Sequence, residues 1–169
     1  MTRTMMLGIA AGSAVLAMLN AAPARTQQLS YAVTAADRPD PAALERQAAV
    51  LYESPKNFKR AAGLLVQAAE LRDVTDPMKV KDQSLAARLY YYAGDRDRGL
   101  MLLEKSADIA MNTGDVLVAA QLYLDASYVA QELKRGEEVR RLAEKARLLM
   151  SSPLVHARDR DRMLSRING

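Results

Sequence analysis

Apolar side chains recur at intervals of three and four residues along most of the chain, which is the spacing of a helix that buries one face. Helix-starting signals divide this pattern, because an aspartate or a serine precedes a proline at Asp40, Asp76 and Ser152. Gly94 and Gly114 are each followed by an aspartate. The glycine is typical of a helix end, and the aspartate is typical of the start of the next helix. The pattern predicts helices over residues 41–53, 57–72, 77–93, 96–112, 115–134, 137–150 and 153–167.

The predicted helices repeat one another. Small residues recur with spacings of 13 and then 7 residues in three successive copies, and the copies begin 38 and then 40 residues apart. Small side chains let neighbouring helices approach closely, and three stacked hairpins bury a core that one hairpin cannot bury alone. These landmark residues are Ala48, Ala61 and Ala68 in the first copy, Ala86, Gly99 and Ser106 in the second, and Ala126, Val139 and Ala146 in the third.

The repeat resembles the tetratricopeptide repeat (TPR) family. Tyr52 and Tyr90 match the family's tyrosine late in the first helix, Phe58 matches the aromatic residue that opens the second helix, and Pro153 matches the closing proline. The resemblance covers about residues 42–153. It implies an all-α fold, an α-solenoid of three antiparallel helical hairpins plus a C-terminal capping helix. We therefore expect hairpins over residues 41–73, 77–112 and 115–150 within a domain of residues 41–152, and the capping helix within residues 153–169.

A solenoid of this kind places the first helix of each hairpin on its concave side. In the first helix, Ala48 and Tyr52 share the sector that packs against the core, so the side chains on the opposite sector are expected to face a concave groove. Transfer of these positions along the repeat gives the equivalent residues of the next two hairpins. The candidate partner-binding residues are Arg46, Val50, Lys81, Ser84, Arg88, Tyr91, Tyr92, Gln121, Leu124, Tyr128 and Gln131.

Two interpretations of the tyrosines in this set stay open. Together with Arg88 they would form an amphipathic strip, which suits a peptide or helix that carries apolar anchors and an acidic group. Alternatively, Tyr91, Tyr92 and Tyr128 complete the core between stacked hairpins, because aromatic residues at helical spacing are usually packing residues.

Residues 1–24 have the organisation of a signal peptide. Arg3 supplies a positive charge, an uncharged apolar stretch follows, and an Ala-Pro-Ala pattern predicts cleavage between Ala24 and Arg25. The alternative is an uncleaved anchor helix, because the apolar stretch is close to the shortest length that spans a membrane. We expect a flexible lead-in over residues 25–40 and a periplasmic or secreted location.

The composition argues against most catalytic chemistry. The chain has no cysteine and a single histidine, His156, which excludes disulfide scaffolds and thiol nucleophiles and disfavours histidine metal sites. It also lacks a glycine-rich phosphate loop, a dinucleotide fingerprint and any zinc-ligand spacing. We therefore expect no catalytic residue, no metal and no cofactor, and hence a protein that is not an enzyme.

The formal net charge of +4 is unevenly distributed. Residues 134–169 carry ten basic and five acidic side chains, so the basic character belongs to the C-terminal end. The basic residues are interleaved with acidic ones and no nucleic-acid-binding module is present, so we expect no nucleic acid partner.

The sequence thus predicts an exported interaction module that binds a protein or peptide partner in the cell envelope. The alternative is a self-associating structural component, tethered to the membrane if the N-terminal segment is uncleaved. Homo-oligomers would then form through the C-terminal helix, whose apolar residues are Leu154, Ala157, Met163, Leu164 and Ile167.

Overall fold

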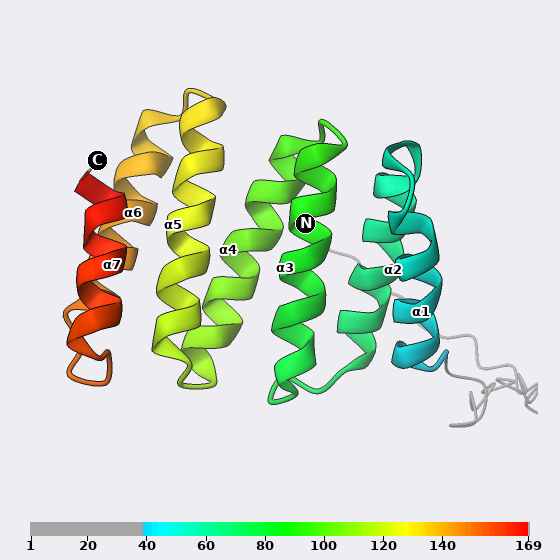
Figure 1. The fold of residues 1–169 in the computed structure, drawn as a ribbon, viewed down its shortest axis with the longest axis horizontal. Coiled ribbons are helices and arrows are strands. Elements are labelled where there is room, and N and C mark those ends of the chain that lie inside the picture. The colour runs from blue at the N-terminus through cyan, green and yellow to red at the C-terminus, as the bar shows by residue number, and fades with distance from the viewer. Residues whose placement is uncertain (1–38, 169) are drawn as a thin grey trace, which may run out of the picture.

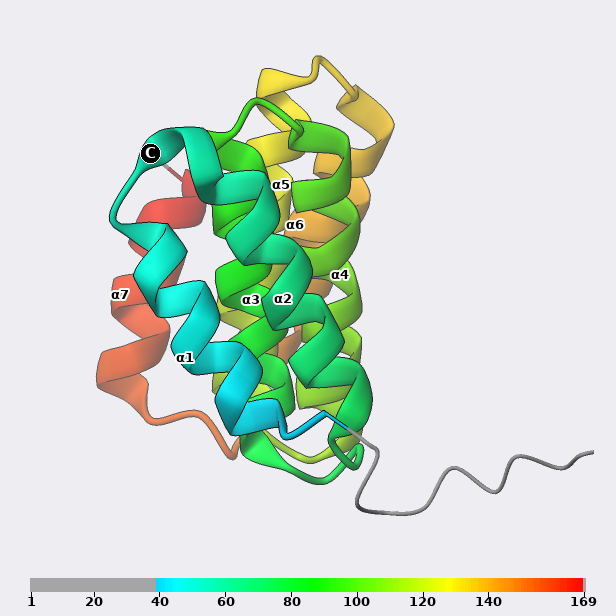
Figure 2. The ribbon, with the colours of Figure 1, turned by 90° about the vertical axis from the view of Figure 1, so that its right-hand side faces the viewer.

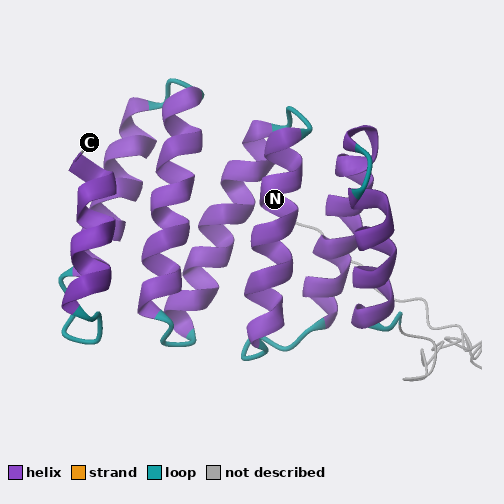
Figure 3. Cartoon of the chain, in the orientation of Figure 1, coloured by secondary structure: helices purple, strands orange, loops and turns teal. Residues whose placement is uncertain are grey.

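The computed structural model describes residues 39–168 of the chain, and their side chains as far as residue 165. Helices separated by short turns make up this part of the chain, and it contains no strand (Figure 3). The expected all-α class is therefore confirmed. The helices are α1 (Pro41–Tyr52), the short 3₁₀ helix η2 (Pro55–Asn57), α2 (Phe58–Leu71), α3 (Pro77–Tyr92), α4 (Arg96–Asn112), α5 (Val116–Glu132), α6 (Gly136–Met150) and α7 (Ala157–Asn168).

The helices form two layers. The odd-numbered helices α1, α3, α5 and α7 lie side by side in one layer, and α2, α4 and α6 form the other (Figures 1 and 2). Each helix packs against the next helix of the chain, from α1 to α7. The result is a solenoid-like stack in which the chain advances from one end to the other.

Two aspartates begin helices as predicted. The side chain of Asp40 accepts a hydrogen bond from the amide of Ala42 at 3.0 Å, and the side chain of Asp76 accepts one from the amide of Met78 at 2.8 Å. Each aspartate satisfies one of the amide groups that a helix leaves unpaired in its first turn, and proline follows at the first helical position. These caps set the start of α1 and α3.

The small landmark residues of the repeat lie in the core. All of them except Val139 are buried, and Val139 is half-buried. The closest approach is at Gly99 of α4, where an added Cβ atom would lie 3.0 Å from the carbonyl oxygen of Ala87 on α3. The backbones of α3 and α4 are therefore in contact at this point, as the repeat pattern predicts.

Three turns between helices share one backbone geometry. Gly94, Gly114 and Lys134 have φ values of 81°, 83° and 59°, which lie in the left-handed region. In the third turn the amide of Arg135 donates to the carbonyl oxygen of Ala130 at 3.0 Å, and the first two turns have the equivalent bond. Lys134 thus takes a conformation that favours glycine, because the same helix-ending hydrogen bonds are formed there.

The predicted start of the last helix is wrong. Ser152 and Pro153 do not cap α7, which begins at Ala157, and residues 151–156 form turns. The side chain of Val155 is buried at 4% exposure, and the guanidinium of Arg160 donates to the carbonyl oxygens of Ser152 and Val155. The chain therefore folds inward against the core before the helix starts.

Part of the apolar surface of α7 is buried against the rest of the chain. Met163 is buried and Leu164 is packed against the core, whereas Leu154, in the preceding turn, is 76% exposed. The side chain of Ile167 lies outside the described part.

The N-terminal predictions concern residues that the structure does not describe. The signal peptide over residues 1–24, the cleavage site between Ala24 and Arg25, and the lead-in as far as residue 38 all lie outside the described residues. Among the helices of residues 39–168, none has both the length and the apolar character that crossing a membrane requires.

Two glycines inside helices provide a test of the close packing. We expect Gly99→Ala to lower the free energy of unfolding by about 1–2 kcal/mol, because the added methyl group would press on the carbonyl oxygen of Ala87. The matched change Gly63→Ala should raise it by up to about 1 kcal/mol, because its Cβ would meet only the Tyr90 hydroxyl, at 3.9 Å. Urea unfolding of the full-length variants measures both changes. A Gly99→Ala variant more stable than the original chain would contradict the contact.

Candidate binding surface on the odd-numbered helices

Large apolar side chains are exposed on each of the first three odd-numbered helices. Tyr52 on α1 is 52% exposed, Tyr92 on α3 is 67% exposed and Tyr128 on α5 is 38% exposed. Leu85 of α3 is also exposed, next to the α1 side of that helix. We call the outer surface of α1, α3 and α5 the odd-helix face. Two hollows, one on each side of α3, divide this face.

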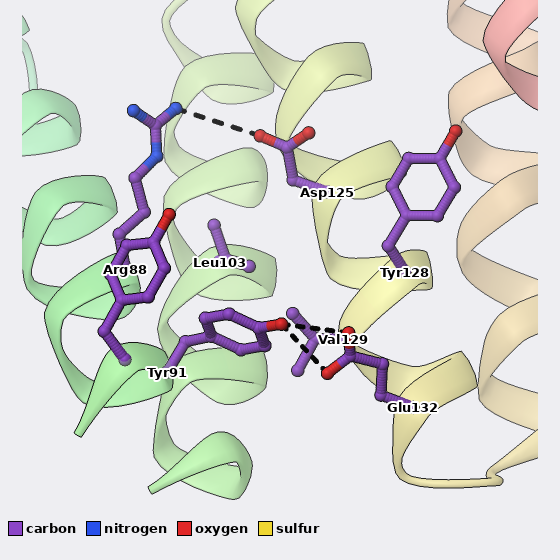
Figure 4. Close-up of a pocket in the computed structure, with 8 residues that line it drawn as sticks. Arg88, Tyr91, Leu103, Asp125, Tyr128, Val129 and Glu132 are labelled. Carbon is purple, nitrogen blue, oxygen red and sulfur yellow. Dashed lines mark hydrogen bonds and ion pairs between the residues drawn. The ribbon is translucent and has the colours of Figure 1, made fainter. Parts of the chain in front are cut away.

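The first hollow, the α3/α5 groove, lies between the C-terminal halves of α3 and α5 (Figure 4). It has a volume of about 300 Å³, and Leu103 of α4 lines it from the layer behind. Its other lining residues are Arg88, Tyr91 and Tyr92 of α3, and Asp125, Tyr128, Val129 and Glu132 of α5.

The charged groups of the α3/α5 groove are paired with one another. The hydroxyl of Tyr91 donates to both carboxylate oxygens of Glu132, at 2.9 and 3.0 Å, and this hydrogen bond raises the pKa of Tyr91. Glu132 also forms an ion pair of 3.5 Å with Arg96, and Arg88 forms one of 3.9 Å with Asp125 (Figure 4). The groove therefore presents aromatic surface between charges that are largely compensated.

A chain of aromatic contacts links the first helices of the face. The rings of Tyr52 and Phe58 are stacked with centroids 5.6 Å apart, and the ring of Phe58 lies 6.5 Å from that of Tyr92. Tyr92 in turn meets Tyr91 edge to face at 5.3 Å. Because Tyr52 and Tyr92 remain mostly exposed, these contacts hold two aromatic side chains in place while leaving their outer faces open.

The second hollow, the α1/α3 groove, has a volume of about 330 Å³ and a mostly apolar lining. The α1 wall was not predicted from the sequence, because the position of Tyr52 in the repeat indicated the core and Glu45 and Ala49 were not among the expected binding residues. Those three residues follow a spacing of four and three residues, which is the signal that marks one helix face. The lining residues are Glu45, Ala48, Ala49 and Tyr52 of α1, Leu65 of α2, and Met78, Lys81, Asp82, Leu85 and Leu89 of α3.

The structure brings five of the expected partner-binding residues to the two grooves. Lys81 lines the α1/α3 groove, and Arg88, Tyr91, Tyr92 and Tyr128 line the α3/α5 groove. The three tyrosines are half-buried or exposed, so none of them is a fully buried core residue.

The expectation for Leu124 is wrong. Its side chain is 1% exposed, because this side of α5 packs against the core, and Leu124 is therefore not available to a partner. Position 124 was obtained by transfer from Arg46 through Ser84 along the repeat, but the side chain of Arg46 is 72% exposed on α1 at the end of the stack. A helix inside the stack is enclosed on more sides than α1, so one repeat position has different burial in different copies.

The remaining expected residues do not line the two grooves. Ser84 lines a separate hollow between the N-terminal ends of α3 and α5, and Gln131 lines one at the turn between α5 and α6. Gln121 donates a hydrogen bond of 2.7 Å to Asp125. Arg46, like Val50, is exposed on α1 but does not line the α1/α3 groove.

A partly buried arginine lies beside the α1/α3 groove. The Nε atom of Arg72 donates to Asp82 at 2.9 Å, one terminal nitrogen donates to Asp76 at 2.9 Å, and the other contacts Glu45. The side chains of Arg72 and Asp82 are only 14% and 4% exposed. Since Glu45 belongs to α1 and Asp82 to α3, this cluster ties together the two walls of the groove.

The pKa values of two carboxylates in the cluster, Asp76 and Asp82, are shifted in opposite directions. Burial raises the pKa of Asp82, and the hydrogen bond from Arg72 opposes this change only in part. The pKa of Asp76 is lowered, first by the hydrogen bond from the Met78 amide and then by the one from Arg72. Lys79 adds positive charge near Asp76 and donates to the carbonyl oxygen of Arg72 at 2.8 Å. The cluster was not predicted from the sequence, because no helical spacing links Arg72 to Glu45 or to Asp82.

Among residues 39–168, no three or more His, Asp or Glu side chains are grouped so that they could hold a metal ion. The single histidine, His156, is exposed in the turn before α7.

Loss of the arginine provides a test of the cluster. We expect Arg72→Met to lower the free energy of unfolding by about 3 kcal/mol, because it leaves three carboxylates close together without their common partner. The matched change Arg60→Met, at an exposed arginine of α2, should change it by less than about 0.5 kcal/mol. Urea unfolding of the full-length variants measures both values, and equal stability of the two would show that the cluster does not hold α1 to α3.

The chain was compared with protein-family models, with curated proteins and with solved structures, and none of the three comparisons found a match.

Proposed function

We propose that this chain is an exported, non-enzymatic scaffold of the TPR type, which docks a peptide or helix of a cell-envelope protein on the odd-helix face. The observation that carries the proposal is the gathering of exposed aromatic and aliphatic side chains around the two grooves beside α3. Proteins rarely leave such side chains together on their surface unless a partner covers them.

The chemistry of the grooves supports a protein partner. Tyrosine and arginine supply much of the binding energy in protein interfaces, and Tyr92, Tyr128 and Arg88 lie around one hollow. The charges beside them are largely compensated within the chain. A partner that buries the apolar surface therefore does not leave a carboxylate without a counter-charge. An amphipathic helix that lays its apolar side chains into such grooves is a common mode of recognition.

Cross-linking tests the docking face. We expect a photoreactive amino acid in place of Tyr92 to become covalently joined to an envelope partner, because Tyr92 is exposed at the α3/α5 groove. The matched control places the same amino acid at Met101, which is 58% exposed on α4 of the other layer and should give no product. The double change Tyr92→Ala with Tyr128→Ala should weaken binding of the captured partner at least about tenfold. Capture from Met101 with none from Tyr92 would contradict the docking face.

The N terminus of the protein tests export. Signal-peptide cleavage at the predicted site would leave Arg25 as the first residue, and N-terminal sequencing of protein from the envelope fraction measures this directly. An intact Met1 in that fraction would contradict cleavage and would favour an anchored protein.

A further inference from the structure

Between the two grooves, α3 exposes a row of alternating positive and apolar side chains, which we call the crest of α3. Lys81, Leu85, Arg88 and Tyr92 are separated by four, three and four residues, which places them along one face of the helix. All four are exposed. Lys81 and Arg88 lie two turns apart, a rise of about 10 Å along the helix.

The acidic groups nearest to this crest already have partners. Asp82 and Glu45, which line the α1/α3 groove, both contact Arg72 from within the fold. Asp125, across the α3/α5 groove, accepts a short hydrogen bond of 2.7 Å from Gln121. Glu45 and Asp82 are thus held by a group other than the cations of the crest, and Asp125 has a closer partner than Arg88.

Within residues 39–168, the two cations of the crest are at most weakly compensated. Within residues 39–168 Lys81 lies in ion-pair distance of no carboxylate, although its side chain lines the α1/α3 groove. Arg88 reaches Asp125 only at 3.9 Å, and its side chain remains 59% exposed. An exposed pair at this distance contributes little, so the guanidinium can bind a better-placed carboxylate at small cost.

We propose that the crest of α3 binds an amphipathic helix of the partner that carries two acidic side chains two turns apart, with an apolar side chain between them. The inference rests on the proposed docking function and names the chemistry of its partner. One carboxylate pairs with Lys81 and the other with Arg88. The apolar side chain between them packs on Leu85.

The spacing of the crest favours a helical partner over an extended one. Side chains at positions i and i+7 of a helix share one face and are separated by the same rise of about 10 Å as Lys81 and Arg88. In an extended chain a separation of about 10 Å corresponds to three residues, and side chains three apart point to opposite faces. The α1/α3 groove also extends along α3 from Met78 to Leu89, so it can receive apolar side chains from one flank of a docked helix.

Selection from a library of random peptides, each about 14 residues long, tests the proposal on the full-length chain at low salt, where surface charges are least screened. We expect the selected peptides to be enriched in pairs of Asp or Glu seven residues apart, with Leu, Ile or Phe three or four residues after the first acid. The same selection on a Lys81→Glu, Arg88→Glu double variant should enrich Lys or Arg at those two positions.

Single charge reversals make the test quantitative. Lys81→Glu and Arg88→Glu should each weaken binding of a selected diacidic peptide about fivefold, measured by fluorescence anisotropy. Replacement of the corresponding acid of the peptide by lysine should restore most of that loss. The matched control is Lys105→Glu, which makes the same change at an exposed lysine of α4 and should leave the affinity unchanged.

The outcomes separate the two proposals. If no peptide is enriched by the folded chain, the docking function fails and this inference fails with it. If the selected peptides bind the odd-helix face but lack the paired acids, or if their affinity is indifferent to Lys81→Glu and Arg88→Glu, the docking function stands and this inference is overturned. It is also overturned if light scattering shows a dimer that Arg88→Glu dissociates, because a second copy of the chain is then the occupant. Displacement of selected peptides by a synthetic peptide of residues 25–38 overturns it as well, since the chain then supplies its own occupant.

Discussion

The close approach of helices along small side chains is the constraint on which the rest of this structure depends. At Gly99 no side chain separates α4 from the backbone of α3, and the equivalent place holds Ala61 in the first copy and the half-buried Val139 in the third. Each helix can therefore pack directly against its neighbour in the chain, and the stack grows in one direction. Alternate helices share a layer as a result, and larger side chains such as Leu89, Tyr123 and Leu142 fill the core between these contacts.

The odd-helix face combines two properties that an interface needs. Exposed tyrosines supply apolar area at a small cost in conformational entropy, because contacts such as that between Tyr52 and Phe58 already restrict their rings. Most charges on the face are paired within the chain, so a partner can cover it without leaving them unsatisfied. Lys81 and the weakly paired Arg88 differ from the others, and under the proposed function they are the charges that select a partner.

The cluster around Arg72 performs a different task from the small-residue contacts. Small residues determine how closely neighbouring helices pack, whereas Arg72 joins α1 to α3, which are not consecutive. Its carboxylates come from both walls of the α1/α3 groove, so the same contacts that hold α1 in place also define the shape of a candidate site. Under the proposed docking function, stability and recognition therefore depend on shared residues at this end of the stack.

The sequence by itself determined the helices, two of their caps and the small contact residues, because these depend on neighbours a few positions away and on repetition along the chain. Only the tertiary structure decided which side of each helix is open. Leu124 is buried and Tyr52 is exposed, against expectation, because a helix inside the stack is enclosed on more sides than α1 at its end. The contact between Glu45 and Arg72 joins residues 27 positions apart. No local pattern marks such a pair, since it exists only once the helices between them have packed.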